Sequence, residues 1–162
     1  MNCEKGNKMP KLYVMCGISG SGKSTYAKSI QSSARNSTII ISTDELRAML
    51  YGDASDQTDP ELIFNMAYAM IQLLLERDYD VIFDAMNLKA RARKDLINRF
   101  HGIATMECVV CKVPIEEACF RQTLRERHVP EDIVFAQSKR MSIPTYDEGW
   151  DIITYNEDNN NV

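Results

Sequence analysis

The chain has 162 residues, a formal net charge of −4 at neutral pH, and 44% hydrophobic and 26% charged residues, which predicts a single globular domain with a sizeable core. The negative net charge excludes a global basic field, so any binding to nucleic acid needs a local basic patch. The sequence has five cysteines and no apolar N-terminal signal segment, which predicts a cytoplasmic protein with free thiols. It has no apolar stretch as long as a membrane span, so no membrane partner is expected.

The first predicted strand leads into a loop of glycine and hydroxyl residues. Residues 1–10 are polar and end in a proline, which predicts a flexible N-terminal arm. Residues 11–16 are an apolar run typical of a central parallel strand. Gly17 and Gly22 then stand at the spacing of a phosphate-binding loop. The strand before this loop and a helix predicted from residue 23 to about residue 33 favour that interpretation over a plain Gly/Ser-rich turn.

The loop has the chemistry to bind the phosphates of a nucleoside triphosphate. Glycines permit positive φ angles, so that successive N–H groups can point at an anion, and the following helix turns its positive end toward the phosphates. Lys23 supplies a charge for the β and γ phosphates, and the hydroxyl of Ser24 is placed to bind Mg²⁺. The predicted nucleotide-binding residues of the loop are Ser19, Gly20, Ser21, Gly22, Lys23, Ser24 and Thr25.

A pair of opposite charges follows the second predicted strand, residues 38–42, which is rich in β-branched side chains. Asp44 and Arg47 lie three residues apart at the start of a short helix predicted through Leu50, so they share a face. One interpretation is structural: Thr43 or Asp44 caps the helix, and the charges form an ordinary ion pair. The other is catalytic, with a carboxylate that accepts a proton from an attacking hydroxyl and a guanidinium that binds a phosphate. The position of the pair, beside the phosphate-loop unit in the sequence, favours catalysis.

The third predicted strand, residues 79–83, ends at Asp84, after a loop at 51–58 and a helix predicted from 59 to about 77. An apolar strand that ends in aspartate resembles the Walker B arrangement, in which the carboxylate lies near Mg²⁺. The alternative is that this aspartate only shapes the turn. The next predicted helix, 89–100, carries cations that form either a solvated face or a local patch for a phosphodiester backbone. These cations are Lys89, Arg91, Arg93 and Lys94.

The rest of the chain predicts two strands and two helices, at 105–113, 116–126, 130–141 and 152–155. Arg121 and Arg125 lie one turn apart on the first of these helices and can form a lid that supplies charge to the leaving phosphates. Neighbouring glutamates offer the alternative of surface ion pairs, which stabilise little. Cys108 and Cys111 lack the second pair of ligands that a zinc site needs, which predicts buried, inert thiols. Residues 156–162 are rich in Asn and Asp and predict a disordered polar tail.

Strands that alternate with helices along the chain predict an α/β fold with a mostly parallel sheet. The expected architecture is a three-layer P-loop NTPase fold with about five strands and a helical lid that carries arginines, in one domain over residues 11–155. In such sheets ligands bind at the carboxyl ends of the strands. The phosphate loop, the Asp44 segment and the Asp84 segment all follow strands, so we expect one site at that edge.

These motifs, in this order, resemble those of the P-loop polynucleotide kinases, the kinase half of nucleic-acid repair enzymes, and of the related predicted P-loop kinases. The resemblance covers about residues 11–155. It implies an ATP-dependent kinase that uses Mg²⁺ and transfers the γ-phosphate to the 5′-hydroxyl end of DNA or RNA. The matching segments are Gly17–Thr25, Asp44–Arg47, Asp84–Leu88, Val113-Pro114, Arg121–Arg127, Val129-Pro130 and Pro144–Trp150.

The resemblance also implies a role for each matching position. Asp44 would be the general base, and Arg47 would bind the acceptor's own phosphate. Arg125 would stabilise the transferring phosphoryl group, although Arg127 competes for this role. The implied sets are Lys23, Asp44, Arg47 and Arg125 for catalysis; Arg121 and Arg125 for the nucleotide; Asp44, Arg47, Asp84, Asn87 and Val129 for the acceptor; and Ser24 and Asp84 for the metal.

Two other functions fit the same motifs. One is a kinase for a small metabolite, a nucleoside or a modified base in DNA, which the acidic net charge favours, whereas the basic helix at 89–100 favours a polymer. The other is an ATP-binding module without catalysis, against which the presence of Asp44 and the lid arginines argues. No second catalytic domain of the phosphatase or ligase type is recognisable, so a stand-alone kinase is expected.

Overall fold

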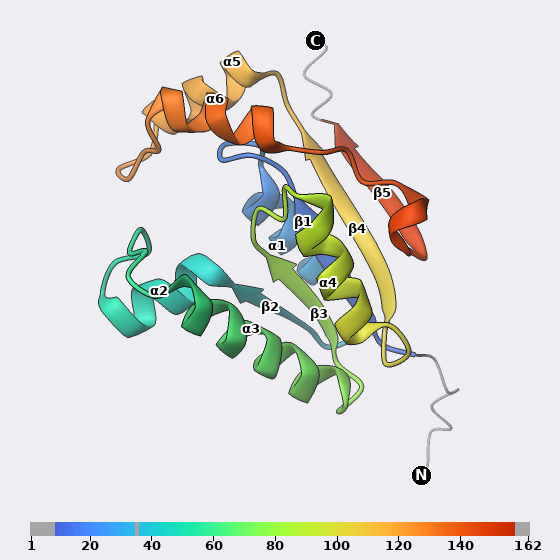
Figure 1. Ribbon diagram of the computed structural model, residues 1–162. Helices are drawn as coiled ribbons and strands as arrows, with labels where there is room; N and C mark the ends of the chain where they lie inside the picture. Colours follow the sequence, from blue (N-terminus) through green and yellow to red (C-terminus); the bar gives the residue numbers. More distant parts are fainter. Residues whose placement is uncertain (1–8, 35, 158–162) are drawn as a thin grey trace.

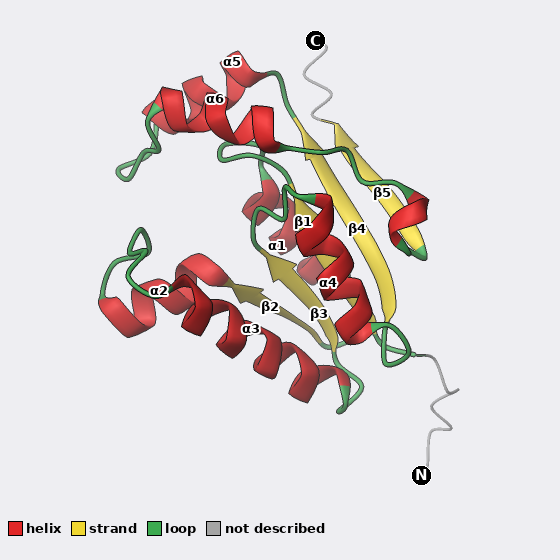
Figure 2. Ribbon diagram, in the orientation of Figure 1, coloured by secondary structure: helices red, strands yellow, loops and turns green. Residues whose placement is uncertain are grey.

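The computed structural model describes residues 9–34 and 36–157, and its centre is a parallel sheet of five strands in the order β2-β3-β1-β4-β5 (Figure 1). Figure 2 shows the strands as one twisted layer with helices on either side of it. This confirms the predicted three-layer α/β fold. The strands are β1 (Lys11–Cys16), β2 (Thr38–Ser42), β3 (Asp80–Asp84), β4 (Thr105–Lys112) and β5 (Ile152–Glu157). The helices are α1 (Lys23–Ser33), α2 (Thr43–Tyr51), α3 (Pro60–Leu75), α4 (Ala90–Phe100), α5 (Ile115–Thr123), α6 (Glu131–Arg140) and the 3₁₀ turn η1 (Tyr146–Glu148).

Side-chain alternation along the central strand β1 divides the core between the two faces of the sheet. Leu12 and Val14 pack with the buried stripes of α3 and α4 on one face. Met15 packs with Ala27 of α1 on the other. Both faces of β1 are therefore covered, which explains why this strand is apolar from Leu12 onward instead of alternating with polar residues.

The observed boundaries change two predictions. Helix α5 ends at Thr123, three residues before the predicted end at 126, and the Thr123 hydroxyl donates to the Phe120 carbonyl at 2.7 Å, a local bond that competes with helix continuation. Strand β5 runs to Glu157, because its last residues pair with β4 up to Lys112, so residues 156–157 belong to the sheet rather than to the predicted tail. The remaining tail, 158–162, lies outside the described residues.

The N-terminal arm is described only at its end. Thr105 donates its backbone N–H to the Pro10 carbonyl at 2.8 Å, so the last residue of the predicted arm is bound to the sheet. Residues 1–8 lie outside the described part of the chain. Among the helices of the described part, none is long and apolar enough to cross a membrane.

The sheet places the functional segments at one edge. All strand pairs are parallel, so the phosphate loop after β1, the start of α2 after β2 and Asp84 at the end of β3 lie at the same end of the sheet. Ser42 pairs with Asp84 in the register of β2 and β3. The sequence from Ser42 onward therefore begins beside Asp84, and Asp44 lies two residues beyond it.

Candidate active site

The backbone of the phosphate loop requires its glycines. Gly20 and Gly22 both have φ of 85°, in the left-handed region that side chains disfavour. A Cβ on Gly17 would lie 2.7 Å from the Cys111 carbonyl oxygen, and one on Gly20 would lie 2.4 Å from the Ala118 carbonyl oxygen of α5. Gly22 is also the N-terminal cap of α1, and no side chain hydrogen-bonds there. The first N–H groups of α1 are therefore available to an anion.

The two lid helices, α5 and α6, pack directly on this loop (Figure 1). The buried Gln137 of α6 accepts a hydrogen bond from the Ser19 backbone N–H at 2.9 Å. On α5, the Arg121 Nη1 lies 3.6 Å from the position of a Cβ on Gly22, so the guanidinium lies beside the loop. Arg121 also pairs with Glu117 at 2.9 Å. The sequence analysis missed Gln137, because one polar residue in a charged helix carries no signal of a contact more than a hundred residues away.

Lys23, Ser24 and Asp84 meet at the start of α1. The Ser24 hydroxyl donates to Asp84 Oδ2 at 2.7 Å, which brings together the two predicted metal ligands. The Lys23 ammonium donates to the Ile18 carbonyl at 2.8 Å, within the loop. Burial lowers the pKa of Lys23, and the charge of Asp84 partly opposes this.

The donor set fits Mg²⁺. A hydroxyl and a carboxylate are hard oxygen ligands, and Mg²⁺ is commonly held by one or two protein groups together with substrate phosphates and water. Within residues 9–34 and 36–157, no group of three or more His, Cys, Asp or Glu side chains could hold a metal ion by itself. Ser24 and Asp84 beside a phosphate-binding loop therefore suit a metal that arrives with a nucleotide.

The start of α2 presents Asp44 toward solvent. The helix cap is Ser42, whose hydroxyl accepts from the Glu45 N–H at 3.4 Å, so the predicted cap at Thr43 or Asp44 is wrong. The last residue of β2 takes that role, which leaves the Asp44 carboxylate free of capping. Its side chain is 61% exposed and pairs through Oδ1 with Arg47 Nη1 at 3.1 Å. Arg47 is 7% exposed at its side chain, and its Nε has no hydrogen-bond partner among the described residues.

The lid arginines differ from the predicted arrangement. Because α5 ends at Thr123, Arg125 and Arg127 follow the helix instead of lying on it, so Arg121 and Arg125 do not share a helical face. Arg127 Nη1 lies 3.7 Å from Asp44 Oδ2. Arg125 is exposed, and its backbone N–H donates to the Gln122 carbonyl at 3.2 Å. The structure therefore brings Arg127, rather than Arg125, to Asp44.

The turn after β3 is tied to the strand that leads into the phosphate loop. Asn87 has φ of 49°, and its side-chain amide donates to the Met15 carbonyl at 2.8 Å. The Gly17 N–H donates to the Met86 carbonyl at 3.0 Å. Asn87 was predicted to contact the acceptor; its observed contacts hold the loop in position. Val129, the other predicted acceptor contact, is half-buried in the cluster of Ile18 under the lid.

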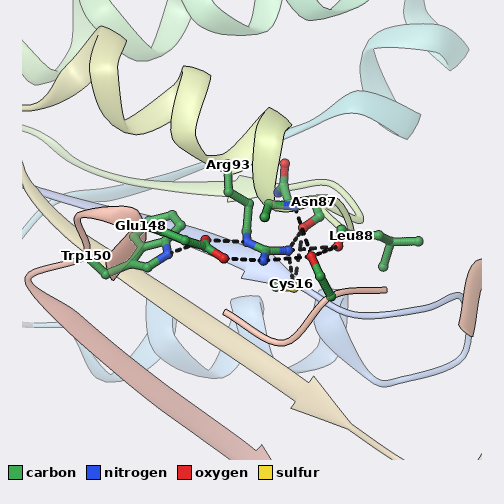
Figure 3. A network of polar contacts seen from close by, with 8 residues as sticks. Cys16, Asn87, Leu88, Arg93, Glu148 and Trp150 are labelled. Carbon is green, nitrogen blue, oxygen red and sulfur yellow. Dashed lines mark hydrogen bonds and ion pairs between the residues drawn. The ribbon is translucent and has the colours of Figure 1, made fainter. Parts of the chain in front are cut away.

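Arg93 is fully buried, which overturns the prediction that it belongs to an exposed basic face (Figure 3). Its guanidinium forms two parallel bonds to Glu148, at 2.8 and 2.6 Å, and donates to the Asn87 and Leu88 carbonyls at 3.0 and 2.8 Å. Trp150 Nε1 donates to the same carboxylate at 3.0 Å. The segment Pro144–Trp150, which contains Glu148 and Trp150, thus anchors the turn after β3.

The spacing of Arg93 from the apolar residues of α4 indicates that its side chain is buried. Arg93, Leu96, Ile97 and Phe100 recur at i, i+3, i+4 and i+7, the pattern of one buried helical face, and all four are buried. The other three cations of residues 89–94, Lys89, Arg91 and Lys94, are exposed. Burial disfavours the charge of Glu148, but the bonds from Arg93 and Trp150 outweigh it and lower the pKa of Glu148.

Cys108 and Cys111 are buried free thiols that face opposite sides of the sheet, as their positions on a strand predict. Burial raises the pKa of Cys111 to about 11, which keeps its thiol protonated and unreactive at neutral pH.

A family model described as an AAA domain matches residues 12–143 of the chain. Of the curated proteins, none matches. Among solved structures, a chain of the Pnkp1/Rnl/Hen1 RNA repair complex is 26% identical with a TM-score of 0.75 over 86% of this chain. That alignment covers 46% of the repair-complex chain, so the present chain spans about half of its length.

Two further structures show the same fold at lower identity. A gluconokinase from Sinorhizobium meliloti is 20% identical with a TM-score of 0.62, and the alignment covers 93% of this chain and 84% of the gluconokinase. The APS kinase CysC from Mycobacterium tuberculosis, in complex with AMPPNP and APS, is 18% identical with a TM-score of 0.65, covering 91% and 89% of the two chains. These likenesses establish the fold of P-loop kinases and leave the acceptor open.

Proposed function

The chain belongs to the AAA domain family whose model spans most of it, and on this premise we propose that it is an ATP-dependent kinase for the 5′-hydroxyl end of DNA or RNA. The observation that carries the proposal is the Asp44–Arg47 pair at the carboxyl end of β2, beside Asp84 at the end of β3. A base and a phosphate-binding cation thus stand next to a site for a nucleoside triphosphate.

The donor half of the site consists of the phosphate loop and the start of α1. The N–H groups of α1 and the loop would bind the β and γ phosphates, and Lys23 would exchange its carbonyl contact for them. Ser24 and Asp84 would hold Mg²⁺, which supplies positive charge to the phosphates when bound. Arg121 above Gly22 would add charge from the lid side.

The acceptor half consists of Asp44 and Arg47. The exposed Asp44 carboxylate would accept the proton of the attacking hydroxyl as that oxygen forms its bond to the γ-phosphorus, while the bond from the γ-phosphorus to the β,γ-bridging oxygen breaks and ADP leaves with those electrons. Arg47 is held by burial and by its bond to Asp44, and its Nε is a buried donor without a hydrogen-bond partner among the described residues, which a phosphate would satisfy. A 5′-terminal nucleotide carries such a phosphate on its own 3′ side. The likeness at 26% identity to a chain of an RNA repair complex supports a nucleic-acid acceptor.

A small hydroxyl-bearing acceptor is the second candidate. The gluconokinase and the APS kinase match this chain in length better than the repair-complex chain does. The net charge of −4 favours it too, and burial of Arg93 removes one of the four cations at 89–94 that would form a patch for a polymer. These observations concern the acceptor and leave the proposed phosphoryl transfer unchanged.

Acceptor labelling tests the proposal. The protein is incubated with Mg²⁺ and ATP that is radiolabelled at the γ-phosphate, together with 5′-hydroxyl oligonucleotides of DNA and RNA, nucleosides or sugar acids. The same oligonucleotides with a 5′-phosphate are the matched control. We expect label on the 5′-hydroxyl oligonucleotides and none on the control. Label on a small alcohol alone would replace the polymer acceptor by the second candidate, and label on no acceptor would contradict a kinase.

A further inference from the structure

Arg127 lies in the segment between the two lid helices, residues 124–130, which we call the lid loop. Figure 1 shows this loop at the free end of α5 and α6, opposite the loop between α2 and α3. The Arg127 side chain is 46% exposed, and its guanidinium reaches from the lid to Asp44. This ion pair therefore joins the lid to the acceptor half of the proposed site.

The two oxygens of Asp44 are held unequally. Oδ1 bonds at 3.1 Å to Arg47, which is buried in the same helix. Oδ2 lies 3.7 Å from Arg127 Nη1, beyond ordinary hydrogen-bond length, and both of these side chains are substantially exposed. An incoming hydroxyl that binds Asp44 meets less competition at Oδ2, so it would displace Arg127.

The charges around Asp44 favour an anion. Arg47, Arg127 and Asp44 together carry a net positive charge before any acceptor binds. The field of Arg127 also extends to the loop after α2: the pKa of Asp53 is lowered by hydrogen bonds from the Ser55 hydroxyl and amide and, to a smaller extent, by the charge of Arg127. Arg127 is thus a cation beside both the proposed base and the α2–α3 loop.

We propose that Arg127 determines acceptor specificity by binding a phosphate group next to the reacting hydroxyl; this rests on the proposed function. When the hydroxyl takes Oδ2 of Asp44, a phosphate on the same acceptor replaces the carboxylate as the partner of Arg127. A neutral acceptor has no anionic group to replace Asp44 as the partner of Arg127, so the Arg127 guanidinium would be solvated by water instead. Arg47 and Arg127 then hold the phosphate from the α2 side and from the lid side.

The test compares two ligands that differ by one phosphate, adenosine 3′-monophosphate and adenosine. Their dissociation constants are measured with Mg²⁺ and a non-hydrolysable ATP analogue present, so that the nucleotide site is filled. For the wild type we expect tighter binding of the monophosphate. Arg127→Ala should weaken that binding about three- to tenfold, the scale of one partly exposed ion pair, and leave adenosine unchanged. Arg127→Lys should retain part of the difference, and Arg140→Ala, which removes an exposed arginine of α6, should retain all of it.

The other possible results of these binding measurements would overturn the proposed role of Arg127. Equal weakening of both ligands, no weakening of either, or a wild type without preference for the monophosphate would overturn the role of Arg127. Transfer kinetics with the same two acceptors separate this inference from the proposed function. If the wild type binds the monophosphate more tightly through Arg127 but phosphorylates no 5′-hydroxyl, the phosphate contact stands and the kinase proposal fails.

Discussion

Two arginine–carboxylate pairs in this protein have the same chemistry and opposite surroundings. Arg93 and Glu148 are buried, form two parallel bonds and share further hydrogen bonds with Trp150 and two backbone carbonyls. Arg127 and Asp44 are exposed and touch through one atom pair at 3.7 Å. The first pair cannot separate without leaving a buried charge, whereas the second can exchange its partner for a ligand. Burial, not residue type, therefore separates a structural pair from a proposed functional one.

The exposed pair should be the one that matters for catalysis. Asp44→Asn keeps the size of the side chain but removes the basic oxygen, so we expect phosphoryl transfer to fall by the ~10²–10⁴-fold typical of losing a general base. ATP binding should stay unchanged. Steady-state kinetics and a nucleotide titration measure both. Unchanged turnover would reduce Asp44 to an ordinary surface partner of Arg47.

The buried pair should be the one that matters for stability. Glu148→Ala leaves the Arg93 charge unpaired in the core, so we expect the free energy of unfolding to fall by about 3–5 kcal/mol. Urea denaturation measures this, with Glu117→Ala, which breaks a partly exposed pair on α5, as the matched control. A loss no larger than that of the control would mean that the network in Figure 3 adds little to the fold.

Acidification should weaken the buried pair. The pKa of folded Glu148 is lowered, so its contribution to stability is complete above the ordinary glutamate pKa and is lost as the pH falls through the folded value. The urea midpoint of the wild type should therefore drop more steeply below about pH 4.3 than that of Glu148→Gln. Parallel pH profiles of the two proteins would contradict this assignment.

The smallest effect is expected for Arg127→Ala. Because the Arg127–Asp44 pair is exposed, its loss should change the free energy of unfolding by at most about 1 kcal/mol. The same urea experiment measures it. A loss as large as that of Glu148→Ala would show that the lid loop is part of the folded core, and the contrast between the two pairs would disappear.

Local patterns made half of the site predictable from sequence. The phosphate loop and Asp84 each follow an apolar strand, and the carboxyl ends of parallel strands meet, so the contact between Ser24 and Asp84 follows from the fold class. Asp44 and Arg47 lie within one helical turn, so their pairing depends on no distant segment.

The remaining features depend on tertiary packing. Arg127 rather than Arg125 meets Asp44 because of where α5 ends, which is decided by contacts around Thr123 that the pattern of charges does not show. The bond from Gln137 to the loop joins segments far apart in the chain. The burial of Arg93 was predictable in principle, since its spacing from Leu96 places it on the buried face of α4, but its charge suggested a solvent-exposed position.

We propose that the phosphate loop binds the phosphate donor and that the acceptor binds at Asp44. Transfer of the labelled γ-phosphate of ATP to a 5′-hydroxyl oligonucleotide, compared between the wild type and Lys23→Ala, tests this most directly. We expect rapid labelling by the wild type and only background labelling by the variant, because the variant lacks the charge at the β and γ phosphates. Equal labelling by the two proteins would contradict it.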